Sequence, residues 1–319
     1  MKKTHYIILG GVLLLTSSAF MIWKFNSKKN GTPSELSTNI VEQLSDNKEK
    51  SNEEEKKQEE KKFPVNAEIK SLTYSETWDA SPDKKAIDIK IDYLFIENKN
   101  NVKEIDNLNQ LLKEEAQKRF DDVKDRLKEC LKEYLESYKN NEKENKREVD
   151  YNMCFTCVDY ASEITKNNEN GIISISSANY WFAGGVNDVS YNSAVLDCNT
   201  GKKLSIFDVI QGDEIKIREM IGKEIDKSEW ANSIRESGRE PGHPIEGPYF
   251  SDMFTILGFG DNGNSLYDLK NQPFHLEDKC LVIDFSKYDI AAGCDGAPSF
   301  DFYYDTIKKY GFMVDSKFD

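Results

Sequence analysis

Cysteine is the residue type in this chain with the widest choice of chemistry. Six are present, and an even number is typical of disulfide bonds outside the reducing cytoplasm. Cys154 and Cys157 have the spacing of a redox pair, but on a strand their side chains would point to opposite faces. The sequence therefore predicts structural disulfides, with the pairing left open, among Cys130, Cys154, Cys157, Cys198, Cys280 and Cys294.

Histidine is scarce, which limits both metal binding and acid–base catalysis. Zinc binding beside the thiols would need histidine, and the chain has only three, so no metal site and no cofactor are predicted. His243 lies in a loop pattern and His275 in a strand pattern, and no Gly-x-Ser-x-Gly motif precedes either. Carboxylates are abundant, so a peptidoglycan hydrolase that uses a carboxylate pair stays open as the alternative to a binding protein.

Step changes in composition divide the chain. Residues 6–23 carry no charge, are rich in leucine and isoleucine, and as a helix could cross the hydrocarbon core of a membrane. Small residues at 17–19 leave a cleaved signal peptide, and secretion, as the alternative to a single-pass anchor. Composition predicts an anchor or signal segment (1–29) and a disordered charged linker (30–62), followed by a globular region that begins at Phe63.

Hydrophobic periodicity predicts the fold of the region that begins at Phe63. Residues 172–210 read as antiparallel strands in a meander, with an aromatic run before Gly184 and Gly185. One long helix is predicted at 104–138 and a shorter one at 213–227, while 228–272 reads mostly as loop. Further strands are predicted at residues 65–74, 86–96, 151–164, 273–290 and 299–304. The predicted class is α+β, an antiparallel sheet with the two helices packed on it.

The charge balance narrows the choice of partners. Lys and Arg number 43 against 57 Asp and Glu, for a formal net charge of −14. Such a chain repels phosphates, and no basic patch with interleaved aromatic residues is present, so no nucleic-acid partner is predicted. A cationic partner would be attracted instead.

Three segments, in this order, resemble a known group of proteins. The first ends in Tyr180-Trp181-Phe182-Ala183-Gly184-Gly185, the second is Asp197-Cys198-Asn199-Thr200-Gly201-Lys202, and the third spans residues 274–293. They resemble the bacterial extracytoplasmic domains of unknown function 3298 and 4163. These domains are shared by the lysozyme-sensing anti-sigma-V factor and the non-catalytic N-terminal part of a peptidoglycan deacetylase. The resemblance runs from Phe63 to the C-terminus and implies one extracytoplasmic domain in two parts, an N-terminal part similar to domain 4163 (63–165) and a C-terminal part similar to domain 3298 (166–319). The chain departs from the family pattern in two places. After Gly185 it has Val186-Asn187-Asp188, where the family often has a histidine. Its N-terminal tail is short, which makes an anti-sigma role unexpected.

The resemblance and the charge together imply a membrane-tethered binding domain outside the cytoplasmic membrane. Its expected partner is a cell-wall component, such as a glycan, or a cationic protein like lysozyme. The predicted ligand-binding residues lie at two loops and the strand end beside them: Tyr180, Trp181, Gly184, Gly185, Asn187, Asp188, Asp295 and Gly296.

Overall fold

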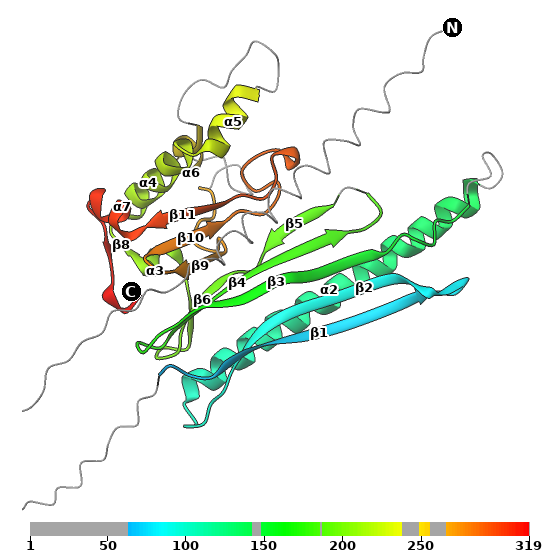
Figure 1. Ribbon diagram of the computed structural model, residues 1–319, viewed down its shortest axis with the longest axis horizontal. Helices are drawn as coiled ribbons and strands as arrows, with labels where there is room; N and C mark the ends of the chain where they lie inside the picture. Colours follow the sequence, from blue (N-terminus) through cyan, green and yellow to red (C-terminus); the bar gives the residue numbers. More distant parts are fainter. Residues whose placement is uncertain (1–62, 142–147, 186, 238–248, 256–265, 319) are drawn as a thin grey trace, which may run out of the picture. The chain divides into compact units, whose positions relative to one another are not determined.

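The computed structural model describes residues 63–141, 148–185, 187–237, 249–255 and 266–318, all within one compact unit, Glu59–Asp319 (Figure 1). The predicted anchor at 6–23, the linker at 30–62 and His243 lie outside these residues. Among the helices that are described, none is both long enough and apolar enough to cross a bilayer.

A seven-stranded sheet forms the centre of the unit. Its order is β1-β2-β3-β4-β6-β7, and β5 pairs with β4 beside β6. The strands are β1 (Ala67–Trp78), β2 (Ser81–Ile96), β3 (Phe155–Asn167), β4 (Ile172–Phe182), β5 (Asp188–Tyr191), β6 (Ala194–Asp197) and β7 (Lys202–Leu204). Neighbours are antiparallel except β2 and β3, which are parallel because a long helix connects them across one face. The predicted α+β class is confirmed, and so is the antiparallel meander at residues 172–210, while β2 and β3 make the one parallel pair of a mostly antiparallel sheet.

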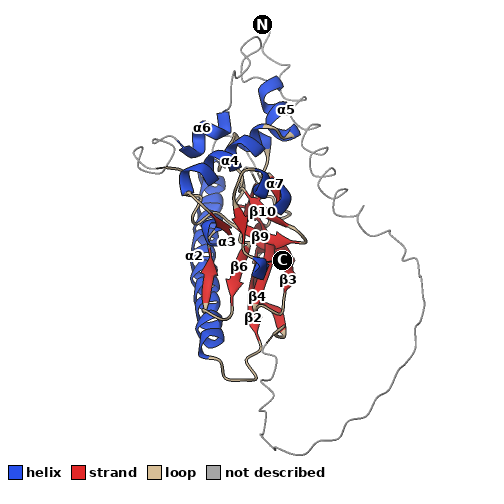
Figure 2. Ribbon diagram, turned by 90° about the vertical axis from the view of Figure 1, so that its left-hand side faces the viewer, coloured by secondary structure: helices blue, strands red, loops and turns tan. Residues whose placement is uncertain are grey.

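That helix is α2 (Lys103–Asn141), and it lies along one face of the sheet (Figure 2). Its apolar residues recur at helical spacing and are buried against the strands, as the sequence predicted. Asn109 fixes the helix to β2, because its side chain bonds both the N–H and the carbonyl of Ile96, at 2.9 and 2.8 Å. The buried stripe consists of Ile105, Leu108, Leu112, Ala116, Leu127 and Leu131.

A second layer covers the opposite face of β4 and β6. Its three-stranded sheet has the order β11-β10-β9, and the N–H of Leu276 in β9 donates to Ser174 Oγ in β4 at 2.8 Å. These strands are β9 (Phe274–Glu277), β10 (Cys280–Asp284) and β11 (Ser299–Tyr303). Around them lie α3 (Ile206–Val209), α4 (Glu214–Asp226), α5 (Glu229–Ser237), α6 (Tyr249–Thr255), α7 (Tyr304–Lys309), and a two-stranded sheet of β8 (Ile210–Gln211) and β12 (Met313–Val314).

Three helices were not expected from the sequence: α3, α5 and α7, which follows the last predicted strand. The strand pattern at residues 204–207 stops at Leu204, because Ser205 and Asp208 form a capping box that starts α3. The stretch 228–272, predicted mostly as loop, contains α5 as well as α6. The predicted helix at 213–227 is confirmed as α4, whose N-terminus is capped by Asp213.

The predicted disulfides are wrong, because none of the six cysteines is joined to another in the structure. Cys157 on β3 and Cys198 after β6 are buried in two different apolar clusters, and Cys280 is buried on β10. Cys130 and Cys154 are half-buried, and Cys294 is exposed. The buried thiols fill space as small apolar side chains, which even cysteine numbers do not distinguish from pairing.

Candidate functional site: a polar cleft beside a buried ion pair

A cleft of about 460 Å³ opens between α2 and the sheet. Its walls come from α2, β2, β4, β6, β7 and the segment that leads into β9. The side chains used below are Arg119, Asn192, Ser193, Lys203 and Gln272, all of which line it. A volume of this size suits a small ligand, since such sites usually measure about 300–1,000 Å³.

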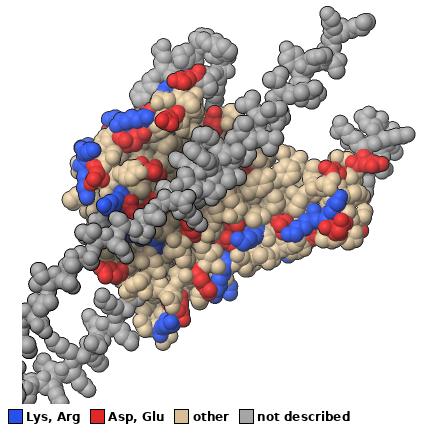
Figure 3. Space-filling model, viewed as in Figure 1, with Lys and Arg blue, Asp and Glu red and all other residues tan. Residues whose placement is uncertain are grey.

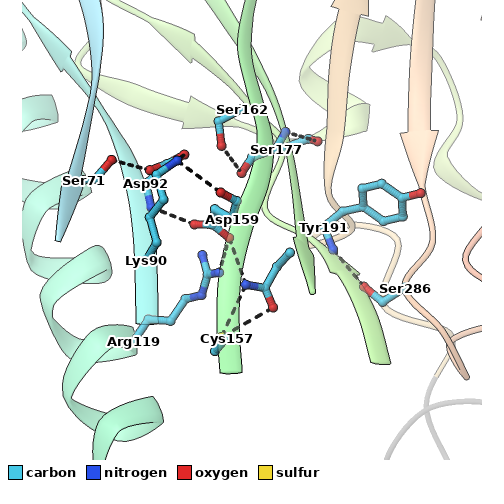
Figure 4. Close-up of polar contacts among 12 residues, drawn as sticks. Ser71, Lys90, Asp92, Arg119, Cys157, Asp159, Ser162, Ser177, Tyr191 and Ser286 are labelled. Atoms are coloured by element: carbon cyan, nitrogen blue, oxygen red, sulfur yellow. Dashed lines mark hydrogen bonds and ion pairs between the residues drawn. The ribbon is translucent and has the colours of Figure 1, made fainter. Parts of the chain in front are cut away.

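Beside the cleft lies a buried carboxylate, Asp159 of β3, which has no exposed surface (Figure 4). One oxygen accepts from Arg119 Nη2 at 2.5 Å and from Asn179 Nδ2 at 3.1 Å. The other accepts from the backbone N–H of Asp92 at 2.7 Å. Three donors, one of them a cation, compensate the loss of water around the carboxylate.

Arg119 links this buried acid to the cleft, because its side chain keeps 25% of its surface exposed. With its amide oxygen turned toward α2, Asn192 accepts from Arg119 Nη1 at 2.9 Å and from Nη2 at 3.1 Å. The guanidinium is thus held between an acid behind it and an amide at the exposed end of β5. Its planar set of donors is fixed before any ligand arrives.

Most of the remaining charges of the cleft are also partnered. Lys203 approaches Glu115 at 3.6 Å, and Asp92 accepts from Lys90 at 2.9 Å. Burial alone would raise the pKa of Asp208, but hydrogen bonds from Ser205, helped by the charge of Lys270, outweigh it and lower that pKa. The cleft therefore offers a ligand mainly amide and hydroxyl groups with little net charge.

Buried polar side chains complete the wall. Ser177 and Ser162 share a hydrogen bond of 3.0 Å, and Ser193 Oγ accepts from the Ser177 N–H at 3.2 Å. Gln272 donates to the carbonyl of Asp284 at 2.5 Å and accepts from Tyr267 at 2.8 Å. These bonds fix the side chains in place, so the wall is preorganised.

The residues predicted from the sequence lie elsewhere, and none of them lines the cleft. Trp181 faces α2, where Arg126 lies 4.8 Å from its ring. Tyr180 therefore points to the opposite face, since side chains alternate along a strand. Gly184 and Gly185 are exposed in the turn after β4, and Gly184 has the positive φ expected of a turn glycine.

The two predicted loops do come together at β5. Lys287 donates its backbone N–H to Val189 at 2.9 Å and its ammonium to the Asn187 carbonyl at 2.6 Å. Tyr191 donates to the Ala297 carbonyl at 3.0 Å, and burial raises its pKa to about 12. We call residues 184–191 with 286–297 the loop pair. Asp295, beside Gly296, contributes its carbonyl to Trp230 at 2.9 Å and so anchors the loop on α5.

The loop pair has an acidic part. Burial raises the pKa of Asp289, and the charge of the neighbouring Asp188 adds to the shift. Across the face seen in Figure 3, however, basic and acidic side chains are interspersed, so the acidic excess of the chain makes no single patch there.

Comparison with known proteins supports the fold. No family model and no curated protein matches the sequence. Among solved structures, a member of the DUF3298 family from Bacteroides fragilis aligns over 80% of this chain and 96% of its own, with a TM-score of 0.51 and 16% identity. The fold is that of this DUF3298 structure. A DUF3298 family protein from Pseudomonas aeruginosa aligns over 81% and 98%, with a TM-score of 0.44 and 13% identity. The resemblance to domain 3298 noted in the sequence is thus supported by structure, whereas the links to domain 4163, the anti-sigma-V factor and the deacetylase stay predictions.

Proposed function

We propose that the described unit is a binding domain of the bacterial cell envelope, tethered through residues 6–23, and that its cleft binds a neutral glycan. The observation that supports this is the internal pairing of most of the cleft's charges, which leaves mainly amide and hydroxyl groups to face a ligand. Sugars are recognised by such groups, and a preorganised wall reduces the entropy lost on binding. The wall glycan is the ligand of this kind that the extracytoplasmic location would supply.

Binding fits the cleft better than hydrolysis. A glycosidase needs one carboxyl group with a raised pKa and a second carboxylate free to act on the sugar or water. At this cleft Asp159 is fully buried under Arg119, and Asp92 accepts from Ser71 at 2.5 Å as well as from Lys90. Asp208 has a lowered pKa, the opposite of what a general acid requires.

Titration calorimetry of the full-length chain with a tetramer of N-acetylglucosamine tests the proposal. Asn192→Ala removes an exposed amide at the cleft, and we expect about fivefold weaker binding, since one hydrogen bond contributes about 1 kcal/mol. Asn232→Ala is the matched control, because this exposed asparagine of α5 also accepts from an arginine, Arg235, but lies outside the cleft. Equal binding by the two variants, or no binding by the wild type at millimolar sugar, would contradict the proposal.

A cationic protein at the loop pair is the second candidate. It is favoured by the raised pKa of Asp289 beside Asp188, because a cation bound there would relieve the repulsion between the two acids. Lysozyme is the probe, titrated at several salt concentrations. We expect affinity to fall as salt rises and to weaken in Asp188→Asn, with sugar binding unchanged. Salt-independent or absent association would remove this candidate and leave the glycan proposal standing.

A further inference from the structure

Strand β1 forms an open edge of the seven-stranded sheet. It pairs only with β2, in unbroken register from Ala67 opposite Ile96 to Glu76 opposite Ile87. Figure 1 shows it at the rim of the unit, with no described element on its outer side. Within the described part of the chain, no backbone group of β1 bonds outside the β2 ladder. About half of its N–H and C=O groups therefore point away from the sheet, as on any antiparallel edge.

The usual protections of an edge are missing from the middle of β1. Proteins block open edges with proline, with charges or with a bulge. From Ser71 to Ser75 the strand has neither proline nor charge, and the register becomes irregular only beyond Glu76. Lys70 is folded back over the Phe95 ring at 3.4 Å, and Glu76 accepts from Tyr74 at 2.5 Å. The two charged side chains nearest to this segment are thus held by residues of β1 and β2, so neither blocks the open edge.

The surface beside this edge has a definite chemistry. On the side of α2, Leu72 and Tyr74 are half-buried and pack in one cluster with Phe120 of the helix. Lys124 lies over the Tyr74 ring, with its ammonium 4.5 Å from the ring centroid. No carboxylate of the described residues lies within ion-pair distance of Lys124. A chain laid beside β1 would meet an apolar strip and two ammonium groups at the Tyr74 ring, those of Lys124 and of Lys128, and Lys128 also interacts with the Tyr74 hydroxyl and the charge of Glu76.

We propose that β1 is a strand-addition site, and that its occupant is an extended segment of a partner protein with an acidic side chain facing Lys124. The open ladder requires an extended backbone, because only a backbone supplies alternating donors and acceptors at this spacing. The half-buried strip calls for apolar side chains at alternate positions of the segment. The unpaired ammonium of Lys124 selects an acidic side chain among them.

A second copy of the chain fits this edge less well. The residues that its own β1 would place toward α2 in the middle of the strand are Leu72 and Tyr74, which carry no negative charge. Glu76 is already the acceptor of Tyr74. A sheet formed between two copies would therefore leave both Lys124 ammonium groups without a partner.

The first test uses a synthetic acetylated peptide that alternates valine and threonine and has one central glutamate. Two comparators carry lysine at the centre, or N-methyl groups on alternate residues that remove one edge of donors. With the full-length chain, we expect the glutamate peptide to bind at least about tenfold tighter than the N-methylated one. It should bind up to about fivefold tighter than the lysine peptide, the range of an exposed ion pair. In Lys124→Glu the order of glutamate and lysine peptides should reverse.

A pair of proline variants makes the result independent of the probe's charge. Along an edge strand the N–H groups alternate inward and outward, so of Thr73→Pro and Tyr74→Pro only one removes a bond to β2. The variant that keeps the wild-type melting temperature has lost an outward donor, and we expect its peptide affinity to fall about tenfold. Wild-type affinity in that variant, equal binding of the N-methylated peptide, no binding of any peptide, or dimerisation of the chain through β1 would each overturn the proposal.

Discussion

Two carboxylates are buried in this molecule in nearly the same way and in different surroundings. Asp159 on β3 and Asp284 on β10 have 0% and 1% of their surface exposed. Asp159 is held by Arg119 and Asn179, and Asp284 by His275 Nδ1 at 2.9 Å and Ser299 Oγ at 2.7 Å. Both acids can be buried because each of their carboxylate oxygens has a hydrogen-bond partner in place of water.

The partners decide what each site can do. Arg119 comes from α2, so its ion pair joins the helix to the sheet at the border of the cleft. His275 comes from the strand next to Asp284, and only 6% of it is exposed, so this pair joins two neighbouring strands inside the second layer. A ligand in the cleft lies beside Arg119 of the first site, whereas it meets the second only through Gln272, whose amide donates to the backbone carbonyl of Asp284. The first pair therefore lies at the border of the proposed binding cleft, and the second lies inside the fold.

The largest effect is expected from Asp159→Ala. It leaves the Arg119 guanidinium partly buried without its counter-charge, and removal of one member of a buried pair costs about 3–5 kcal/mol. Urea denaturation measures the loss of unfolding free energy, with the exposed Asp122→Ala on α2 as the control, expected within about 0.5 kcal/mol of wild type. A loss below about 1 kcal/mol would mean that the pair does not hold the helix on the sheet.

Asp284→Ala should cost less, about 1–3 kcal/mol, because it leaves a histidine and a hydroxyl without an acceptor in place of an arginine. Calorimetry on the same variant should give wild-type affinity for the N-acetylglucosamine tetramer, since the pair does not line the cleft. Weakened sugar binding at full folding would show that the second layer is coupled to the cleft and would break the comparison.

Arg119→Lys is expected to separate the two roles of the first site. Lysine keeps the charge beside Asp159 but cannot donate to Asp159 and Asn192 at once with fixed planar geometry. We expect a stability loss of about 1 kcal/mol and a severalfold weaker affinity for the sugar, measured by denaturation and calorimetry. Unchanged affinity would remove Arg119 from the binding wall and leave it a structural residue.

The fold could be predicted where periodicity acts within one element. The stripe from Ile105 to Leu131 gave the long helix, and the alternation in residues 86–96 gave β2. What periodicity does not contain is the order in which distant strands pair. The parallel register of Ile87 with Phe155 follows from the crossover of α2, which no local pattern records.

The candidate site could not be predicted for the same reason. Arg119 is one of many charged residues on α2, and nothing in its spacing separates it from the solvent-facing ones. Asp159 was the one residue that could have pointed to the site from the sequence. It is a lone acid between Cys157 and Ala161 in a strand pattern, and such an acid must either face solvent or pair with a hydrogen-bond donor or a cation. The glycine signal that stood out instead marks the turn after β4, where the positive φ of Gly184 explains it, and the aromatic signal lies on β4, where Trp181 packs beside Arg126 of α2.

The smallest effect is expected from a buried group that has no hydrogen-bond donor beside it. Asp159 and Asp284 are buried with donors, so this group tests whether burial without a donor keeps an ionisable side chain neutral. The Cys198 thiol is fully buried and has no hydrogen-bond partner in the described part of the chain, and burial raises its pKa from 9.0 to about 12. As pH rises above 9.0, the unfolded chain releases this proton and the folded chain keeps it, so the unfolding free energy falls toward pH 12. Below pH 9 the group has almost no effect on the unfolding free energy.

Between pH 8 and pH 10 we expect this thiol to account for about 1 kcal/mol of the loss of unfolding free energy. Cys198→Ala should therefore show a shallower alkaline decline in urea denaturation than wild type, despite a constant packing cost. An identical decline would mean that burial without a partner does not keep this thiol neutral. The explanation that Asp159 and Asp284 can be buried because they have hydrogen-bond donors would then be contradicted.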